Sequence, residues 1–191
     1  MEPLKARLFY YPTLIWNVAR KSDARRWYDR VDENILIGAL PFRSHANELV
    51  KQENVRGVVT MNENYETRFV SPNQQEWGAL GVKQLRLSTV DFYQSPSVER
   101  VEEAINFIDD VNKDGCSVYV HCKAGRGRSA TVVLCYIMKH YRYDPFHALQ
   151  FLKTKRSHIK LCEAQQLTVN HYYKKLSENL EKQCNPQNAE E

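Results

Sequence analysis

The chain has 191 residues, 42% hydrophobic and 26% charged, and this composition suits one globular domain rather than a disordered, collagen-like or disulfide-dense protein. The net charge of +4 is too small to predict nucleic-acid binding, but it is compatible with an anionic substrate or an anionic membrane surface. The cysteines, 5 in number, form no C-x-x-C pair, which argues against a zinc site or a disulfide framework and favours a reducing compartment.

Residues 1–26 differ in character from the rest of the chain. Their apolar and aromatic stretch, "LFYYPTLIWNVA" (8–19), is interrupted by Pro12 and is shorter than the roughly 20 residues that a membrane-spanning helix needs. No Asp or Glu occurs between residues 3 and 22, whereas basic residues flank the stretch. Such a segment is typical of organelle targeting or of an interfacial membrane anchor, and the alternative is an N-terminal helix packed on the domain. The basic residues are Lys5, Arg7, Arg20 and Lys21.

The first half of the domain alternates strand and helix patterns. "NILIGALP" (34–41) and "VRGVVTMN" (55–62) are apolar runs that predict buried strands, and "SHANELVKQE" (44–53) predicts a short helix between them. "VKQLRLS" (82–88) alternates apolar and polar residues and predicts a third strand. The loop that follows, "TVDFYQSPS" (89–97), is a place where functional residues commonly lie.

The second half is mostly helical. Apolar residues recur at helical spacing after Ser97, with Gly115 as the stop, and "CSVYV" (116–120) then predicts a buried strand. Strands interleaved with helices predict an α/β domain over residues 27–182, with a central, mainly parallel sheet flanked by helices, followed by a polar tail at 183–191. The helices are expected at residues 97–115, 129–141, 145–155 and 163–182.

The segment "HCKAGRGRS" (121–129) lies between the last predicted strand and an apolar helix. Backbone N–H groups in such a loop converge on one point, and the helix N-terminus adds its own donors, so the segment predicts an anion site. Gly125 and Gly127 permit positive φ and leave room for an oxyanion. Arg128 supplies a bidentate fork for phosphoryl oxygens, and these surroundings lower the pKa of a thiol such as Cys122. The pattern therefore indicates a sulfur nucleophile directed at phosphorus.

The pattern H-C-x5-R-S resembles the signature of the cysteine-dependent phosphatases of the protein-tyrosine and dual-specificity superfamily. The resemblance implies a dual-specificity phosphatase-like fold and a phosphocysteine intermediate formed by Cys122. It also implies that Arg128 holds the phosphoryl charge, that Ser129 assists departure of the thiolate, and that His121 supports the loop. The residues implied to bind the substrate phosphate are Lys123, Ala124, Gly125, Arg126, Gly127 and Arg128.

This chemistry needs a proton donor for the leaving oxygen. Asp91 is the candidate, because it lies in the loop after the third predicted strand, 122 − 91 = 31 residues before the cysteine, which resembles the spacing in the dual-specificity group. The loop amides and Arg128 supply the charge stabilisation that a metal would give, and no carboxylate cluster has metal-ligand spacing. We therefore expect no metal and no other cofactor.

Longer stretches resemble the mitochondrial phosphatidylglycerophosphatase family, also called mitochondrial protein-tyrosine phosphatases. They are "WYDRVDENILIGALPFR", "ENVRGVVTMNENYETRF", "EWGALGVKQLRLSTVDF" and "VYVHCKAGRGRSAT". The resemblance implies removal of the terminal phosphate of phosphatidylglycerophosphate, which gives phosphatidylglycerol for cardiolipin synthesis. It implies a peripheral position at the matrix face of the inner mitochondrial membrane. It also implies that Glu63, Tyr65 and Glu66 support the active site.

The positive charges of the loop bear on the substrate. Lys123 and Arg126 add charge at the rim of the loop beyond what one phosphate dianion needs, which suits a substrate with a second anionic group, such as the phosphodiester of this lipid. The family tends to carry an Arg-Pro pair before its last helix, where this chain reads "RSHIKLCEAQQL". Lys160 is the candidate to replace the contact that this arginine would make with a phosphate or headgroup. The alternatives are a protein phosphatase acting on phosphotyrosine or phosphothreonine, a phosphoinositide phosphatase, and a phosphate-binding module without turnover.

Overall fold

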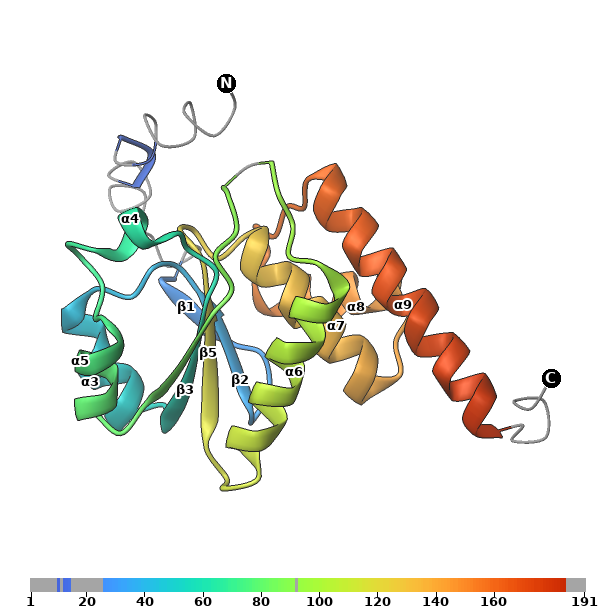
Figure 1. Ribbon diagram of the computed structural model, residues 1–191, viewed down its shortest axis with the longest axis horizontal. Helices are drawn as coiled ribbons and strands as arrows, with labels where there is room; N and C mark the ends of the chain where they lie inside the picture. Colours follow the sequence, from blue (N-terminus) through green and yellow to red (C-terminus); the bar gives the residue numbers. More distant parts are fainter. Residues whose placement is uncertain (1–9, 11, 15–25, 92, 185–191) are drawn as a thin grey trace.

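The computed structural model describes residues 10, 12–14, 26–91 and 93–184. Within them, a 5-stranded sheet has the strand order β1-β2-β5-β3-β4 (Figure 1). β1 is antiparallel to β2, and the other neighbouring strands are parallel, so the prediction of a mainly parallel sheet is confirmed. The strands are β1 (Tyr28–Arg30), β2 (Ile35–Gly38), β3 (Val55–Thr60), β4 (Lys83–Arg86) and β5 (Ser117–His121).

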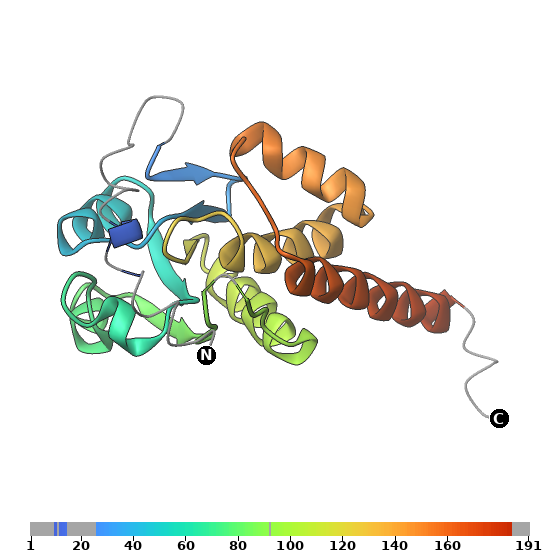
Figure 2. The same ribbon diagram turned by 90° about the horizontal axis from the view of Figure 1, so that it is seen from above.

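Helices cover both faces of the sheet (Figure 1, Figure 2). One face carries α3 (Arg43–Lys51) and α5 (Gln74–Ala79), and a short helix, α4 (Asn64–Thr67), lies at the end of the sheet. The other face carries the long helices, with α7 in the middle and α9 extending beyond the sheet. These are α6 (Val98–Asn112), α7 (Arg128–Tyr141), α8 (Pro145–Lys155) and α9 (Glu163–Cys184).

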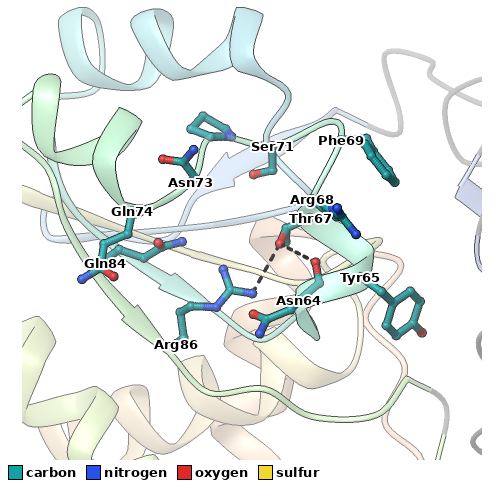
Figure 3. A pocket seen from close by; sticks show the side chains of 11 residues that line it. Asn64, Tyr65, Thr67, Arg68, Phe69, Ser71, Asn73, Gln74, Gln84 and Arg86 are labelled. Atoms are coloured by element: carbon teal, nitrogen blue, oxygen red, sulfur yellow. Dashed lines mark hydrogen bonds between the residues drawn. The ribbon is translucent and has the colours of Figure 1, made fainter.

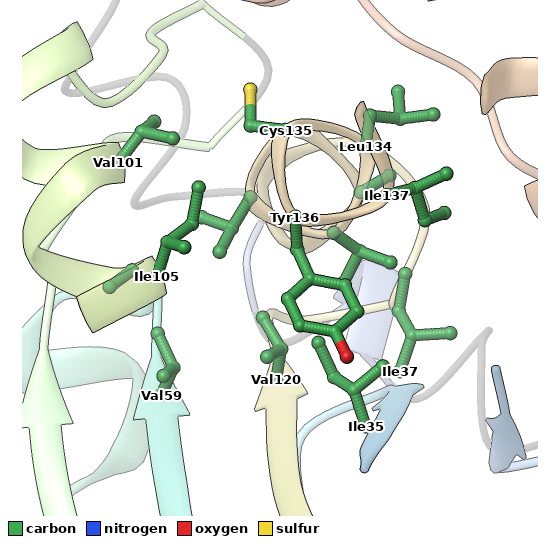
Figure 4. Packing of buried hydrophobic residues seen from close by; sticks show 14 of the residues in the cluster. Ile35, Ile37, Val59, Val101, Ile105, Val120, Leu134, Cys135, Tyr136 and Ile137 are labelled. Atoms are coloured by element: carbon green, nitrogen blue, oxygen red, sulfur yellow. The ribbon is translucent and has the colours of Figure 1, made fainter. Parts of the chain in front are cut away.

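The larger hydrophobic core lies between the sheet and the long helices (Figure 4). Val59 and Val120 from the sheet face Ile105 of α6 and Ile137 of α7, and all are fully or almost fully buried. Each such side chain contributes about 1.5–3 kcal/mol to folding. The smaller core on the other face contains Trp77 and the inward side of α3. Burial on both faces explains why the central strands are continuous apolar runs.

Side-chain caps start the helices where the sequence predicts them. The Ser97 hydroxyl accepts the backbone N–H of Arg100 at 3.4 Å, and α6 begins at the next residue. Asp144 accepts the N–H of His147 at 2.9 Å, with proline at the first helical position of α8. A cap of this kind contributes about 1 kcal/mol. The remaining boundaries differ from the prediction by a few residues at most, as helix ends commonly do.

β1, α4 and α5 were not predicted from the sequence. β1 has only 3 residues, too few for an alternating pattern to be recognised. α5 begins with reciprocal hydrogen bonds between Asn73 and Glu76, at 2.9 and 2.7 Å, within a segment otherwise rich in loop-forming residues. These short elements depend on tertiary packing rather than on local pattern.

The parallel strands bring their carboxyl ends to one edge of the sheet. His121, the last residue of β5, is paired with Gly38 on β2 and with Thr60 on β3, and Thr60 is also paired with Arg86 on β4. The loop that follows His121 therefore begins at the centre of this edge, where functional sites of open α/β sheets typically lie.

Part of the N-terminal segment packs on the domain. Tyr10 and Leu14 are buried and form a small apolar cluster with Leu40. This packing agrees with the alternative interpretation of an N-terminal helix on the domain, although most of residues 1–26 lie outside the described residues. Within the described part of the chain, no helix combines the length and the apolar character needed to cross a membrane.

Candidate active site

The loop of residues 122–128 directs its backbone carbonyls outward. The carbonyl of Lys123 accepts the N–H of Leu40 at 3.3 Å, and the carbonyl of Arg126 accepts the N–H of Lys160 at 3.0 Å. In a trans peptide the N–H points opposite to the C=O of the preceding residue. Each carbonyl held outward therefore turns the next N–H toward the inside of the loop.

Arg156 fixes the carbonyls between these two positions. Its Nη2 donates to the carbonyl of Ala124 at 3.1 Å, and its Nε donates to the carbonyl of Gly125 at 2.8 Å. Arg156 is itself buried and forms an ion pair at 2.6 Å with Asp29 on β1. The buried pair thus shapes the loop into a cup of inward-facing N–H groups, a suitable site for an anion.

The glycines of the loop serve different purposes, which corrects the expectation that both permit positive φ. Gly125 has a φ of +63°, and a Cβ atom there would lie 2.5 Å from the carbonyl oxygen of Gly38. Gly127 has a φ of −122°, an ordinary value for any residue. A Cβ atom at Gly127 would instead lie 2.7 Å from Oε1 of Gln165. The backbone carbonyl oxygen of Lys160 lies 3.2 Å from the same position, so close neighbours rather than a positive φ favour glycine at Gly127.

Cys122 lies at the base of the cup and is 3% exposed. Its Sγ accepts the N–H of Gly125 at 3.2 Å and lies 3.3 Å from the hydroxyl oxygen of Ser129. Burial acts to raise the pKa of the Cys122 thiol, but the charge of Arg128 and the hydrogen bonds from Ser129 outweigh it, and the net effect lowers the pKa. The surroundings therefore favour the thiolate, the nucleophilic form.

His121 precedes the cysteine and is fully buried. Its Nε2 lies 3.0 Å from the Thr60 hydroxyl, which accepts a hydrogen bond from Gln84 at 2.8 Å. Burial, with the nearby charges of Arg86 and Arg128, lowers the pKa of His121 to about 3. The ring is therefore neutral at physiological pH. Its contact with Thr60 on β3 holds the end of β5 in place.

Arg128 is held by a bidentate ion pair with Glu66. The two nitrogen–oxygen distances are 2.8 and 3.0 Å, and both side chains are almost completely buried. The Thr89 carbonyl accepts a further hydrogen bond from Nη1 at 2.8 Å. Burial acts to lower the pKa of Arg128, but the carboxylates of Glu66 and Asp91 raise it above its usual value. The guanidinium is thus permanently charged and fixed beside the thiol.

Asp91, the predicted proton donor, reaches the same place from the loop after β4. Its Oδ1 lies 3.0 Å from Nη2 of Arg128, and its Oδ2 forms an ion pair with the ammonium of Lys123. The structure therefore brings the predicted acid together with the predicted cysteine and arginine, even though the two segments are distant in sequence.

The N-terminal residues form part of the wall of the site. The Lys123 ammonium donates to the Thr13 hydroxyl at 3.0 Å and lies 5.4 Å from the centre of the Tyr10 ring. The Tyr10 hydroxyl donates to the backbone carbonyl of Glu66 at 3.1 Å. Lys123 is thus buried between Asp91 and the N-terminal segment, which differs from the expectation that its charge lies at the rim.

A pocket of about 400 Å³ opens above Cys122. Arg126 lines it while its Nε donates to the carbonyl of His158 at 3.1 Å, and the exposed side chain of Lys160 lies on the same wall. Thr13, Leu161, Cys162 and Gln165 also line this pocket and were not predicted from the sequence. The complete lining is Thr13, Asp91, Cys122, Lys123, Ala124, Arg126, Gly127, Arg128, Lys160, Leu161, Cys162 and Gln165.

The expected supporting residues occupy different positions. Glu66 contacts Arg128 directly. The backbone N–H of Glu63 donates to Oε1 of Glu66 at 3.1 Å, so Glu63 supports the carboxylate through its main chain. The ring of Tyr65 packs edge-on against Tyr10 at a centroid distance of 5.6 Å. Glu63 therefore supports the site through Glu66, and Tyr65 packs on the N-terminal segment.

The ion pair of Arg156 and Asp29 was not predicted from the sequence either. These residues are 127 positions apart, and each stands in a charged context that is normally exposed. Asp29 belongs to the stretch "WYDR", which is part of the family resemblance. That resemblance is the feature of the sequence that could have indicated a role for Asp29.

The fold and the arrangement of cysteine, arginine and acid define the class of cysteine-dependent phosphatases. A family model described as "Dual specificity phosphatase, catalytic domain" matches residues 43–175. The chain belongs to this family, and the expected fold is confirmed.

More closely related proteins narrow the class. The human "Phosphatidylglycerophosphatase and protein-tyrosine phosphatase 1" is 42% identical over 181 residues, which are 93% of this chain and 90% of that protein. The Arabidopsis thaliana "Phosphatidylglycerophosphate phosphatase PTPMT2" is 39% identical, over 87% of this chain and 72% of that protein. The crystal structure of PTPMT1 in complex with PI(5)P is similar to this structure, with a TM-score of 0.79 and 41% sequence identity. The similar region includes 81% of this chain and 99% of the PTPMT1 chain. The resemblance stated from the sequence is confirmed.

Proposed function

We propose that this chain is a phosphatase that removes the terminal phosphate of phosphatidylglycerophosphate through a phosphocysteine intermediate. The observation that carries the proposal is the convergence of Cys122, Arg128 and Asp91 on one pocket. The names of the human and Arabidopsis thaliana relatives support this choice of substrate.

In the first step the Cys122 thiolate attacks phosphorus while the bond from phosphorus to the glycerol oxygen breaks. Asp91, in its acid form, gives its proton to that oxygen, so phosphatidylglycerol leaves as a neutral alcohol. The inward N–H groups and Arg128 hold the phosphoryl oxygens as charge moves onto them. The substrate dianion takes over the contacts that Asp91 makes with Arg128 and Lys123.

In the second step a water molecule attacks the phosphocysteine. Asp91, now a carboxylate, accepts a proton from the water, and the phosphorus–sulfur bond breaks to release inorganic phosphate. Ser129 lies 3.3 Å from the sulfur and donates a hydrogen bond to the departing thiolate. The proton taken from the water restores the acid form of Asp91, so the enzyme is back in its starting state once inorganic phosphate leaves.

Lys160 and Arg126 are proposed to meet the phosphodiester of the lipid. Both line the pocket, and Lys160 is exposed and forms no ion pair within the described residues. We also propose that the protein acts peripherally at the matrix face of the inner mitochondrial membrane. The basic and acid-free character of residues 3–22 supports this location.

Phosphate release from phosphatidylglycerophosphate in mixed micelles, with a chelator present, tests the proposal. Wild type is expected to be active, whereas Cys122→Ser and Asp91→Ala are expected to lose at least about 100-fold in rate, because each removes a chemical step. Full activity of Cys122→Ser would refute the mechanism. Lys160→Ala is expected to raise KM for the lipid and to leave hydrolysis of a small aryl phosphate unchanged.

A second candidate is a protein-tyrosine phosphatase, which the name of the human relative also includes. The same residues would act on a phenolic leaving group, which depends less on Asp91. The ratio of kcat/KM for the lipid to that for phosphotyrosine peptides distinguishes the candidates. A ratio below one favours the protein phosphatase, and a phosphoinositide tested in parallel covers the class bound by the related structure.

A further inference from the structure

A second pocket, of about 610 Å³, lies beside α4 (Figure 3). It shares no lining residue with the pocket above Cys122. α4 contributes to both sites, because Tyr65 and Thr67 line the second pocket while Glu66 holds Arg128. The lining consists of Asn64, Tyr65, Thr67, Arg68, Phe69, Ser71, Pro72, Asn73, Gln74, Gln84 and Arg86.

The residues that line this pocket carry positive charges and no negative charge. Arg68 and Arg86 are its charged residues, and the lining contains no carboxylate. Arg68 is exposed, and its guanidinium carbon lies 5.3 Å from the centre of the Phe69 ring, which is 68% exposed. Neither arginine forms an ion pair within the described residues. The pocket is therefore an electropositive hollow with one apolar rim.

Arg86 is the most informative of these residues. It is half-buried, and its Nη2 makes long hydrogen bonds, both 3.3 Å, to the Asn62 carbonyl and the Thr67 hydroxyl. Its Nε is buried without a partner, and its Nη1 makes no hydrogen bond within the described residues. Burial lowers the pKa of Arg86, and only the charge of Glu66 opposes this effect. A half-buried cation with so few partners is completed by an anion.

Neutral donors surround the two guanidinium groups. Figure 3 shows polar side chains from α4, from the segment before α5 and from β4 around the same space. Gln84 contributes an acceptor there, because its Nε2 donates to the Thr60 hydroxyl and its buried Oε1 has no partner within the described residues. Donors from several directions, with arginine forks among them, match the several acceptor oxygens of a phosphoryl group. The donors besides the arginines are Asn64, Ser71, Asn73 and Gln74, because the donor groups of Thr67 and Gln84 are used by Asn64 and Thr60.

We propose that this pocket is a second binding site, distinct from the active site, for a phosphate-bearing ligand anchored between Arg86 and Arg68. The phosphoryl oxygens lie between the guanidinium groups, and the exposed ring of Phe69 covers the organic part of the ligand. A soluble phosphate ester and the headgroup of an anionic phospholipid both carry such a phosphoryl group. The experiment below distinguishes these two kinds of ligand.

The decisive variant is Arg68→Gln. Arg86 also contacts Thr67, next to Glu66 on α4, so a change at Arg86 is expected to disturb the active site as well. Arg68 is exposed and contacts only the rim. Arg142→Gln removes the same charge from an exposed position outside the pocket and is the matched control.

Nuclear magnetic resonance of the full chain carrying Cys122→Ser measures binding without turnover. The Nε–H signal of Arg86 and the side-chain amide of Gln84 report on the second pocket, and the Gly125 amide reports on the active site. The titrants are inorganic phosphate, glycerol 3-phosphate and soluble dihexanoyl phosphatidylglycerol, each at constant ionic strength. The expected result is a saturable shift at Arg86 whose Kd is weakened about tenfold by Arg68→Gln and is unchanged by Arg142→Gln.

Tighter binding of glycerol 3-phosphate assigns a soluble ester as the ligand, and tighter binding of the lipid assigns a headgroup. The proposal is overturned if no titrant shifts the Arg86 signal saturably. It is also overturned if that signal follows the Gly125 amide with the same Kd and ignores Arg68→Gln. Because the experiment requires no turnover, its failure leaves the proposed catalytic function unaffected.

Discussion

At the scale of single residues, the ion pair of Glu66 with Arg128 connects the position of the arginine to the rest of the domain. Both charges are removed from water, which is costly unless each keeps its partner. The Asn62 amide also donates to Glu66, at 2.5 Å, so the carboxylate is itself held in place. Arg128 therefore needs no rearrangement when a phosphate arrives, which favours catalysis.

Glu66→Gln is expected to lower kcat/KM about 100-fold, because the guanidinium loses its bidentate anchor. It is also expected to reduce the free energy of unfolding by about 3–5 kcal/mol, because Arg128 stays buried without its partner. Steady-state kinetics and urea denaturation measure the two effects. Glu76→Gln is the control, since Glu76 pairs with Arg43 at the surface, where an ion pair contributes little to stability. Equal results for the two variants would contradict the assigned role.

Ser129→Ala is expected to raise the pKa of Cys122, because a hydrogen bond that stabilises the thiolate is lost. Only the thiolate reacts with iodoacetamide, so the pH of half-maximal alkylation should move upward by about one unit. Mass spectrometry of the peptide that contains Cys122 gives the rate at each pH. Ser117→Ala, which changes a buried serine at the other end of β5, should leave that midpoint in place. A downward shift or no shift in Ser129→Ala would refute the assignment.

At the scale of elements, the loop depends on the end of α8. Arg156 follows the last residue of that helix and connects two loop carbonyls to Asp29 on β1. The N-terminal residues add a second support, through Thr13 and Tyr10 on Lys123. The loop is therefore held by a strand, a helix end and the N-terminal segment together.

Arg156→Lys is expected to lower kcat about 10- to 100-fold, because one ammonium cannot hold both carbonyls and the Asp29 carboxylate in place. The loss should be the same for an aryl phosphate as for the lipid, since the shape of the cup serves any phosphoryl group. Kinetics on both substrates test this expectation, with Arg142→Lys as the exposed control. A loss confined to the lipid would show that Arg156 acts on substrate selection instead.

At the scale of the whole molecule, the buried His121 makes stability depend on pH. Burial holds its pKa in the folded state at about 3, below its ordinary value of 6.5. Below pH 6.5 the unfolded chain therefore binds a proton that the folded chain does not bind. Stability consequently falls as the pH decreases from about 6.5 toward 3, by up to about 1.4 kcal/mol per pH unit.

His121→Asn is expected to reduce this slope, because asparagine does not titrate and retains an acceptor for Thr60. Urea unfolding between about pH 7 and pH 5 measures the slope in both proteins. His147→Asn is the control, because His147 is exposed on α8. An unchanged slope in His121→Asn would show that carboxylates alone cause the acid sensitivity.

Features that arise from short-range pattern could be predicted from the amino-acid sequence. Apolar runs and helical spacing located the central strands and the long helices, because burial on one face imposes those periods. The segment from His121 to Ser129 specified the chemistry, since the nucleophile, the loop amides and the arginine lie within one turn of chain. Asp91 was identified from its spacing in the loop after β4.

Tertiary structure alone decided which distant residues complete the site. Glu66 meets Arg128 across 62 positions, and Arg156 meets Asp29 across 127. The placement of β5 between β2 and β3, the cover of Tyr10 over Lys123, and the second pocket at Arg86 belong to the same category. The physical reason is that a charged residue carries no local pattern that reveals whether folding will bury it, whereas the fold assigns its partner and its pKa.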